Sequence, residues 1–121
     1  MANATKCIIQ WNCRGFEANR QELDMLVQKY NPYIICLQET LIKGDNKLSF
    51  KYYKNYDKAG TIDAEGRYHG GVAVLVKESI PQSDIKLTTN LQAIAARVTL
   101  NSPVTICSIY IPPSHPINIR Y

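Results

Sequence analysis

The chain has no long hydrophobic segment and no recognisable leader at its start. It contains no run near the roughly 18 consecutive apolar residues that a membrane-spanning helix needs. Residues 1–5 (Met-Ala-Asn-Ala-Thr) have neither the basic segment nor the apolar stretch of a secretory signal. We therefore expect an intracellular protein, in the nucleus or the cytoplasm, with no membrane partner.

The four cysteines lack the spacing of a metal site. Cys7, Cys13, Cys36 and Cys107 form no Cys-x-x-Cys pair, which argues against a zinc site. Cys7, Cys36 and Cys107 lie inside apolar, strand-like runs, where free cysteine usually acts as a small buried hydrophobe. We therefore expect these three side chains to be buried.

The excess of positive over negative charge is small. The net charge of +4 permits a polyanionic partner without requiring one. Basic and aromatic residues alternate between residues 43 and 58, which is typical either of a nucleic-acid track or of a solvated strand edge. This segment alone favours the strand edge, because charge runs are usually solvated. Its members are Lys43, Lys47, Lys51, Lys54 and Lys58, with Phe50, Tyr52, Tyr53 and Tyr56.

The apolar pattern predicts an α/β fold in a single domain. A near-continuous apolar run at 6–11 indicates a strand buried on both faces. The helix predicted at 19–30 begins with a capping box, Asn19 and Glu22, and ends before Pro32. A second strand at 33–38 completes a strand–helix–strand unit, which predicts a right-handed crossover and parallel pairing.

Strands dominate the rest of the chain. We expect strands near 51–57, 71–77, 92–100 and 104–111, with a hairpin turn at Asn101-Ser102-Pro103. No internal repeat, linker or low-complexity segment interrupts this pattern.

Polar side chains stand at the carboxyl ends of the predicted strands, where α/β sheets usually place ligand sites. Glu39 follows the second strand, and its carboxylate suits Mg²⁺ or Mn²⁺. Asn12 follows the first strand and offers an amide oxygen that can join the metal or orient Glu39. Tyr110 ends the last strand and can donate its phenolic proton to phosphate charge. We expect Gln38 to point to the opposite face from Glu39 and to form buried hydrogen bonds.

Each of these residues also has a structural interpretation. Glu39 can be a capping or salt-bridge carboxylate, and Asn12 can simply form the turn before Gly15. Tyr110 can be a half-buried strand aromatic.

Four short motifs follow one another along the chain: Trp11-Asn12-Cys13-Arg14-Gly15, Leu37-Gln38-Glu39-Thr40, Gly70-Gly71-Val72-Ala73-Val74-Leu75-Val76 and Ile109-Tyr110-Ile111-Pro112-Pro113. In this order they resemble the endonuclease/exonuclease/phosphatase family, and within it the apurinic-like endonuclease domain of jockey-type non-LTR retrotransposons. The resemblance runs from about Lys6 to Ser114 and corresponds to the N-terminal half of the family's domain. It implies a layered α/β sandwich, a mixed β-sheet with a helix on one face, of which residues 1–121 are a part that lacks the C-terminal half.

The resemblance also implies roles and partners. Asn12 matches the active-site asparagine, Glu39 the metal-binding glutamate and Tyr110 the phosphate-contacting tyrosine. The implied activity is Mg²⁺- or Mn²⁺-dependent nicking of DNA, within a protein that continues into a reverse transcriptase. The alternatives are a phosphoinositide or phosphomonoester phosphatase of the same fold, and a truncated element product without chemistry.

The sequence departs from the family pattern in its catalytic residues. The family's Asp-x-Asn motif, its later aspartate and its terminal Asp–His pair have no counterpart up to Tyr121. His69 and His115 do not match the catalytic histidine and are expected to be solvated loop residues. We therefore expect the isolated chain to be inactive. Other departures are Arg14 in place of an acidic residue and Pro113 in place of asparagine, with Ser114 as a substitute hydroxyl.

One expectation concerns the packing of the sheet. Strands apolar at nearly every position need cover on both faces, yet only one amphipathic helix is predicted. We therefore expect a bare, aggregation-prone sheet face involving Ile9, Ile35, Val74 and Ile109 or their neighbours, which the missing half covers in the family.

Overall fold

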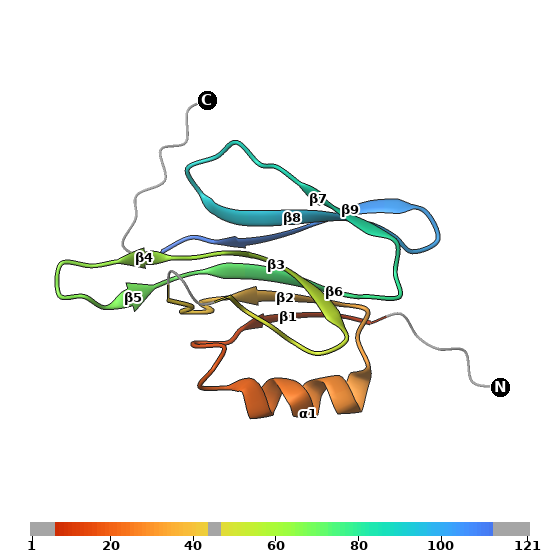
Figure 1. The fold of residues 1–121 in the computed structure, drawn as a ribbon, viewed down its shortest axis with the longest axis horizontal. Coiled ribbons are helices and arrows are strands. Elements are labelled where there is room, and N and C mark those ends of the chain that lie inside the picture. The colour runs from red at the N-terminus through yellow and green to blue at the C-terminus, as the bar shows by residue number, and fades with distance from the viewer. Residues whose placement is uncertain (1–6, 44–46, 113–121) are drawn as a thin grey trace.

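Two packed β-sheets, one helix and a short hairpin make up residues 7–43 and 47–112, which this computed structural model describes (Figure 1). In Figure 1 the helix α1 lies below the first sheet and the second sheet lies above it. The elements are β1 (Ile8–Asn12), α1 (Arg20–Tyr30), β2 (Ile34–Gln38), β3 (Tyr53–Lys58), β4 (Thr61–Ile62), β5 (Tyr68–His69), β6 (Val72–Lys77), β7 (Gln82–Ile85), β8 (Gln92–Thr99) and β9 (Pro103–Tyr110).

The first sheet has the strand order β1-β2-β6-β3 and contains the predicted strand–helix–strand unit. β1 and β2 are parallel, with Asn12 opposite Gln38 at their carboxyl ends. β6 is antiparallel to both β2 and β3, so the sheet is mixed. The predicted parallel pairing is confirmed.

The helix α1 covers one face of this sheet through Leu23, which is buried, and Val27. The predicted capping box is wrong: the Asn19 side chain makes no cap bond and donates instead to the carbonyl oxygen of Cys13, at 2.7 Å. The predicted helix end is confirmed, because Asn31 caps the helix in the left-handed conformation with a φ of 45°. No helix in the described ranges is long and apolar enough to cross a membrane.

The second sheet, with strand order β7-β8-β9, covers the other face of the first. Cys36, Val74 and Val76 of the first sheet form one buried cluster with Ala96 and Val98 of β8. The predicted bare face is therefore wrong for β2 and β6, since the chain's own C-terminal strands supply the second layer. Ile35 and Val74 are fully buried.

Exposed apolar residues occur instead on two edge strands. On β1, Ile8 is 50% exposed, and on β9, Ile109 is 43% exposed. The expectation of buried cysteines holds for Cys36 and fails for Cys107, which lies on the edge strand β9 and is exposed. Cys7 is only partly buried.

The turn predicted between the last two strands is confirmed by the β8–β9 hairpin, while β4, β5 and β7 were not predicted. The β4–β5 hairpin projects from the sheet at the end toward which β1 and β2 point (Figure 1). In the basic and aromatic segment, Phe50, Tyr53 and Tyr56 are buried core residues. This supports the strand-edge interpretation for that segment, because buried rings cannot stack on bases.

Candidate functional site

A cleft of about 510 Å³ opens between the carboxyl ends of β1 and β2 and the end of β9. All three residues that the sequence singled out line it: Asn12 ends β1, Glu39 directly follows β2, and Tyr110 ends β9. The structure therefore brings together side chains that are far apart in the sequence.

Glu39 and Tyr110 are in direct contact across the two sheets. The Tyr110 hydroxyl donates to Oε1 of Glu39 at 3.2 Å. Burial, and then the hydrogen bond and negative charge of Glu39, raise the pKa of Tyr110 above its ordinary value. The phenol is therefore held protonated at neutral pH, as a hydrogen-bond donor facing the cleft.

The backbone at Glu39 is in the left-handed region, with a φ of 54°. Such a conformation costs a non-glycine residue about 1–3 kcal/mol and persists only where neighbouring structure enforces it. Here the Gly15 N–H donates to the Glu39 carbonyl at 2.8 Å, and the Thr40 N–H donates to the Gly71 carbonyl at 3.2 Å.

This backbone conformation decides which side the carboxylate faces. Along β2, Ile35 and Leu37 pack on the helix side, while Ile34 and Cys36 pack toward the second sheet. Strict alternation would send Glu39 to the helix side, opposite Gln38. The left-handed residue reverses this, so Gln38 and Glu39 both line the cleft, and the expectation of opposite faces is wrong.

Gln38 has the buried hydrogen-bonding role that we expected. Its Nε2 donates to Ser108 Oγ at 2.9 Å, and its Oε1 accepts a hydrogen bond from Gln10 Nε2. Ser108 Oγ donates in turn to the Leu37 carbonyl at 2.8 Å. This network ties β1, β2 and β9 together directly beneath the cleft.

The oxygen atoms of the cleft suit a hard cation such as Mg²⁺, most of whose ligands would be water and substrate phosphate. Glu39 supplies a carboxylate, and Asn12 supplies an amide oxygen at the neighbouring strand end. Mg²⁺ commonly takes one or two protein carboxylates and completes its shell with water and substrate phosphate. Among residues 7–43 and 47–112, no group of three or more His, Cys, Asp or Glu side chains is placed to hold a metal.

Of the two histidines, the one that the structure describes, His69, does not line this cleft. His69 lies in the β4–β5 hairpin, 55% exposed, with its Nε2 at 2.7 Å from Oδ2 of Asp63. The hydrogen bond to His69, followed by that from the Arg67 backbone, lowers the pKa of Asp63 to about 2. His115, with Ser114 and Pro113, lies outside the described residues.

A family model described as "Endonuclease/Exonuclease/phosphatase family" matches residues 9–120. The chain belongs to this family. The resemblance that the four motifs carry is thereby confirmed.

Relatives and one solved structure agree with this assignment. The chain is 36% identical over 72 residues to a DNA-(apurinic or apyrimidinic site) endonuclease of Dictyostelium discoideum. This match covers 59% of the chain and 20% of that protein. It is 25% identical over 116 residues to the RNA-directed DNA polymerase from mobile element jockey of Drosophila funebris, covering 93% of the chain and 12% of the relative.

The endonuclease domain of TRAS1, a telomere-specific non-LTR retrotransposon, has the same fold, with a TM-score of 0.64 at 20% identity. The match covers 90% of the chain and 47% of that domain. The described sheets and helix are therefore a partial family sandwich, and the chain spans about half of the solved domain.

The network under the cleft gives a stability prediction. Ser108→Ala removes the hydroxyl that satisfies the buried Gln38 amide and should lower the free energy of unfolding by about 1–3 kcal/mol. Ser83→Ala, at an exposed position of β7, is the matched control and should change it by less than about 0.5 kcal/mol. Urea unfolding monitored by circular dichroism measures both, and equal losses would show that the network does not join the sheets.

Proposed function

We propose that the chain is the N-terminal part of a metal-dependent phosphodiesterase domain, the DNA-nicking endonuclease of a non-LTR retrotransposon. The observation that carries the proposal is the Glu39–Tyr110 pair, 3.2 Å apart, beside Asn12 at the strand ends. The TRAS1 endonuclease domain shares the fold that positions these residues.

Each side chain has a part in this chemistry. Glu39 and Asn12 offer oxygen ligands for Mg²⁺ or Mn²⁺. The phenolic proton of Tyr110, which Glu39 accepts in this structure, is proposed to turn to a phosphate oxygen when Glu39 binds the metal. A bound divalent ion supplies Lewis-acid polarisation of the scissile phosphate. The buried Gln38 amide stabilises the strand ends that carry these side chains, through its hydrogen bonds to Gln10 and Ser108.

Among the described residues, the cleft has no histidine and no second carboxylate to activate water. Glu39 is its only carboxylate among the described residues, and none of its described lining residues is a histidine. A positioned general base typically contributes about 10²–10⁴-fold to a rate. The isolated chain is therefore proposed to be inactive until a complementary half-domain supplies the Asp–His pair that the family resemblance implies.

The two strands that border the cleft are suited to receive that half. β9 lies over β2 and β6, and β8 lies over β6 and β3. β9 is therefore displaced toward β1, so the free edges of β1 and β9 are on the same side of the molecule. Neither β1 nor β9 contains a charged residue. The opposite edge of the first sheet, β3, is charged, with Lys54, Asp57 and Lys58.

Charged edge strands resist pairing with further strands, whereas uncharged apolar edges accept them. We therefore place the remaining half of the domain against β1 and β9, where Ile8 and Ile109 are exposed. The named relatives support DNA as the substrate and a downstream reverse transcriptase, because one is a DNA endonuclease and the other is a mobile-element RNA-directed DNA polymerase.

The metal proposal predicts a local effect of Mn²⁺. Titrating the isolated chain with Mn²⁺ should broaden the amide NMR signals of Asn12, Glu39 and Tyr110 before others, with weak affinity because a single carboxylate binds. Glu39→Gln should remove this selective broadening, while Glu17→Gln, an exposed control, should preserve it. Broadening that survives Glu39→Gln would place the metal elsewhere.

The activity proposal predicts a difference between the isolated and the completed domain. With Mg²⁺ and supercoiled plasmid, the isolated chain should produce no nicked circles. Joined to the C-terminal half of the TRAS1 endonuclease domain, it should nick, and Glu39→Gln should lower the rate by at least about 10²-fold, the loss expected when a group that stabilises transition-state charge is removed.

Two results would contradict this account. Nicking by the isolated chain that Glu39→Gln abolishes would show that residues 1–121 already contain a complete site. A folded hybrid whose nicking is unchanged by Glu39→Gln would show that this cleft is not the catalytic site.

A further inference from the structure

A cross-strand pair of the second sheet contacts the first sheet at two points next to Glu39. Tyr110 at the end of β9 lies directly opposite Gln92 at the start of β8, so the two side chains share one face of their sheet. Tyr110 donates to the Glu39 carboxylate. Gln92 reaches the backbone of a neighbouring loop instead, because its Oε1 accepts the Gly71 N–H at 2.8 Å.

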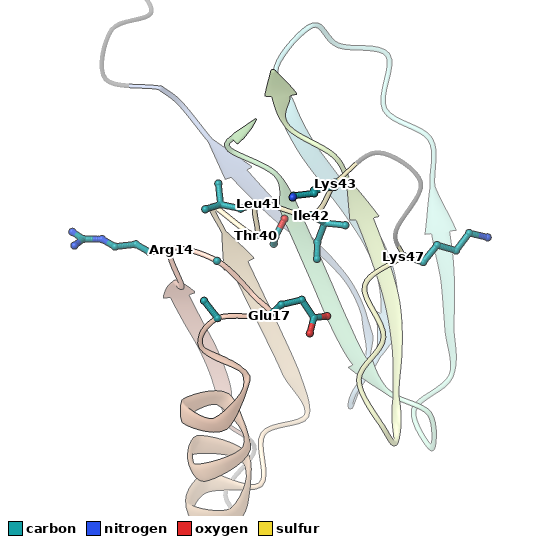
Figure 2. Close-up of a pocket in the computed structure, with 9 residues that line it drawn as sticks. Arg14, Glu17, Thr40, Leu41, Ile42, Lys43 and Lys47 are labelled. Carbon is teal, nitrogen blue, oxygen red and sulfur yellow. The ribbon is translucent and has the colours of Figure 1, made fainter. Parts of the chain in front are cut away.

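The glycine loop between β5 and β6 is bonded to both residues that follow Glu39. The Gly71 carbonyl accepts the Thr40 N–H at 3.2 Å, and the Gly70 carbonyl accepts the Leu41 N–H at 3.0 Å. Thr40 and Leu41 lie in the loop after β2 and line one hollow together with the loop after β1 (Figure 2). The side chain on β8 is therefore joined to the residue after Glu39 through a single glycine.

The backbone that these bonds hold is strained. Glu39 and Leu41 both have left-handed φ angles, of 54° and 53°. Non-glycine residues persist in this conformation only where the surrounding structure enforces it. The two bonds from the glycine loop fix the amides that follow each side of Thr40, between the two strained residues. The glycine loop therefore has to be held in place if Glu39 is to keep its conformation.

The packing at this junction leaves room for the Gln92 amide and fixes the strand that carries it. A Cβ at Gly70, which has a φ of 75°, would lie 2.2 Å from Gln92 Oε1, so a side chain there would displace the amide. The segment that leads into β8 is tied to the first sheet, because Lys58 Nζ donates to the Leu91 carbonyl at 3.0 Å. Gln92 is therefore anchored on its own strand while its amide reaches the glycine loop.

We propose that Gln92 is a positioning residue of the cleft. It holds the glycine loop so that Glu39 keeps the left-handed backbone that turns its carboxylate toward Tyr110. Gln92 does not itself line the cleft, so its effect passes through the backbone and not through a contact with metal or phosphate. The inference rests on the proposed function, since it assigns Gln92 to the site that Glu39 and Tyr110 form.

Two matched variants separate positioning from general stability. Gln92→Met keeps the length of the side chain and removes the acceptor for the Gly71 N–H. Gln82→Met is the control, because the Gln82 amide is also partly buried and accepts from the Tyr56 hydroxyl at 3.0 Å. Gln82 begins β7 and lies opposite Val98, at the end of the sandwich away from the cleft. Both variants should lower the free energy of unfolding.

The first measurement uses NMR of the isolated chain without metal or DNA. In Gln92→Met the exchange of the Thr40 and Leu41 amides, relative to those of β6, should be roughly tenfold faster, the factor that one hydrogen bond of ordinary net strength supplies. The three-bond coupling between the amide and α protons of Glu39, which reports φ, should also change. Gln82→Met should change neither, and Gln92→Glu, which keeps an acceptor oxygen, should preserve the coupling.

The second measurement uses the hybrid with the C-terminal half of the TRAS1 endonuclease domain. Gln92→Met should lower kcat by about 10–10²-fold, the loss expected when a reacting group is displaced by about 1 Å. KM for the plasmid should not change, because Gln92 does not contact the substrate. Gln82→Met should leave both constants as they are.

Failure of the positioning role and failure of the proposed function give different results. An unchanged Glu39 coupling and unchanged amide exchange in Gln92→Met, or equal changes in Gln82→Met, would overturn the positioning role. A raised KM with an unchanged kcat would also overturn it, because Gln92 would then act by binding DNA. A folded hybrid that is indifferent to Glu39→Gln would overturn the proposed function instead, and the NMR measurement would still decide whether Gln92 holds the backbone.

Discussion

The left-handed backbone at Glu39 is the constraint on which the site depends. A strand delivers alternate side chains to opposite faces, so a carboxylate that followed β2 in regular alternation would face the helix. One residue with a φ of 54° turns it toward the second sheet, where Tyr110 meets it at 3.2 Å. The contact between the sheets at this point is therefore a property of the backbone as much as of the side chains.

The surrounding loops are built to hold that conformation. Gly71 accepts the Thr40 N–H at its carbonyl, and Gly15 donates to Glu39 from the other side. Gly71 has a φ of 92°, and a Cβ there would lie 2.3 Å from the Thr40 hydroxyl oxygen. This close approach explains the glycine at position 71, where a larger residue would clash with the Thr40 side chain next to Glu39.

The sequence predicted features that depend on local pattern. Apolar runs located β1, β2, β6 and β9, and polar residues at the ends of three of these strands marked the cleft that Asn12, Glu39 and Tyr110 share. Gln38 was expected to be buried and hydrogen-bonded, and it is. A position in a run and a residue type were sufficient for each of these.

Features that depend on distant contacts were not predicted. The cover on the second face comes from the β7–β9 sheet: strands were predicted near β8 and β9, but their packing as a second layer on the first sheet depends on contacts between distant residues. Asn19 bonds back to Cys13 and not to its own helix, which only the loop geometry decides. The shared orientation of Gln38 and Glu39 depends on the φ of a single residue, which the sequence pattern does not reveal.

The most direct measurement of the central claim compares glycine with alanine at position 39. Glu39→Gly and Glu39→Ala both remove the carboxylate, so their difference in free energy of unfolding reports the backbone alone. A left-handed residue should make Glu39→Gly more stable than Glu39→Ala by about 1 kcal/mol, because glycine adopts this conformation without strain. At Glu17, which does not have a positive φ, alanine should be the more stable of the two. The same preference for alanine at position 39 would show that the backbone there is not left-handed and would contradict the account of how the carboxylate reaches the cleft.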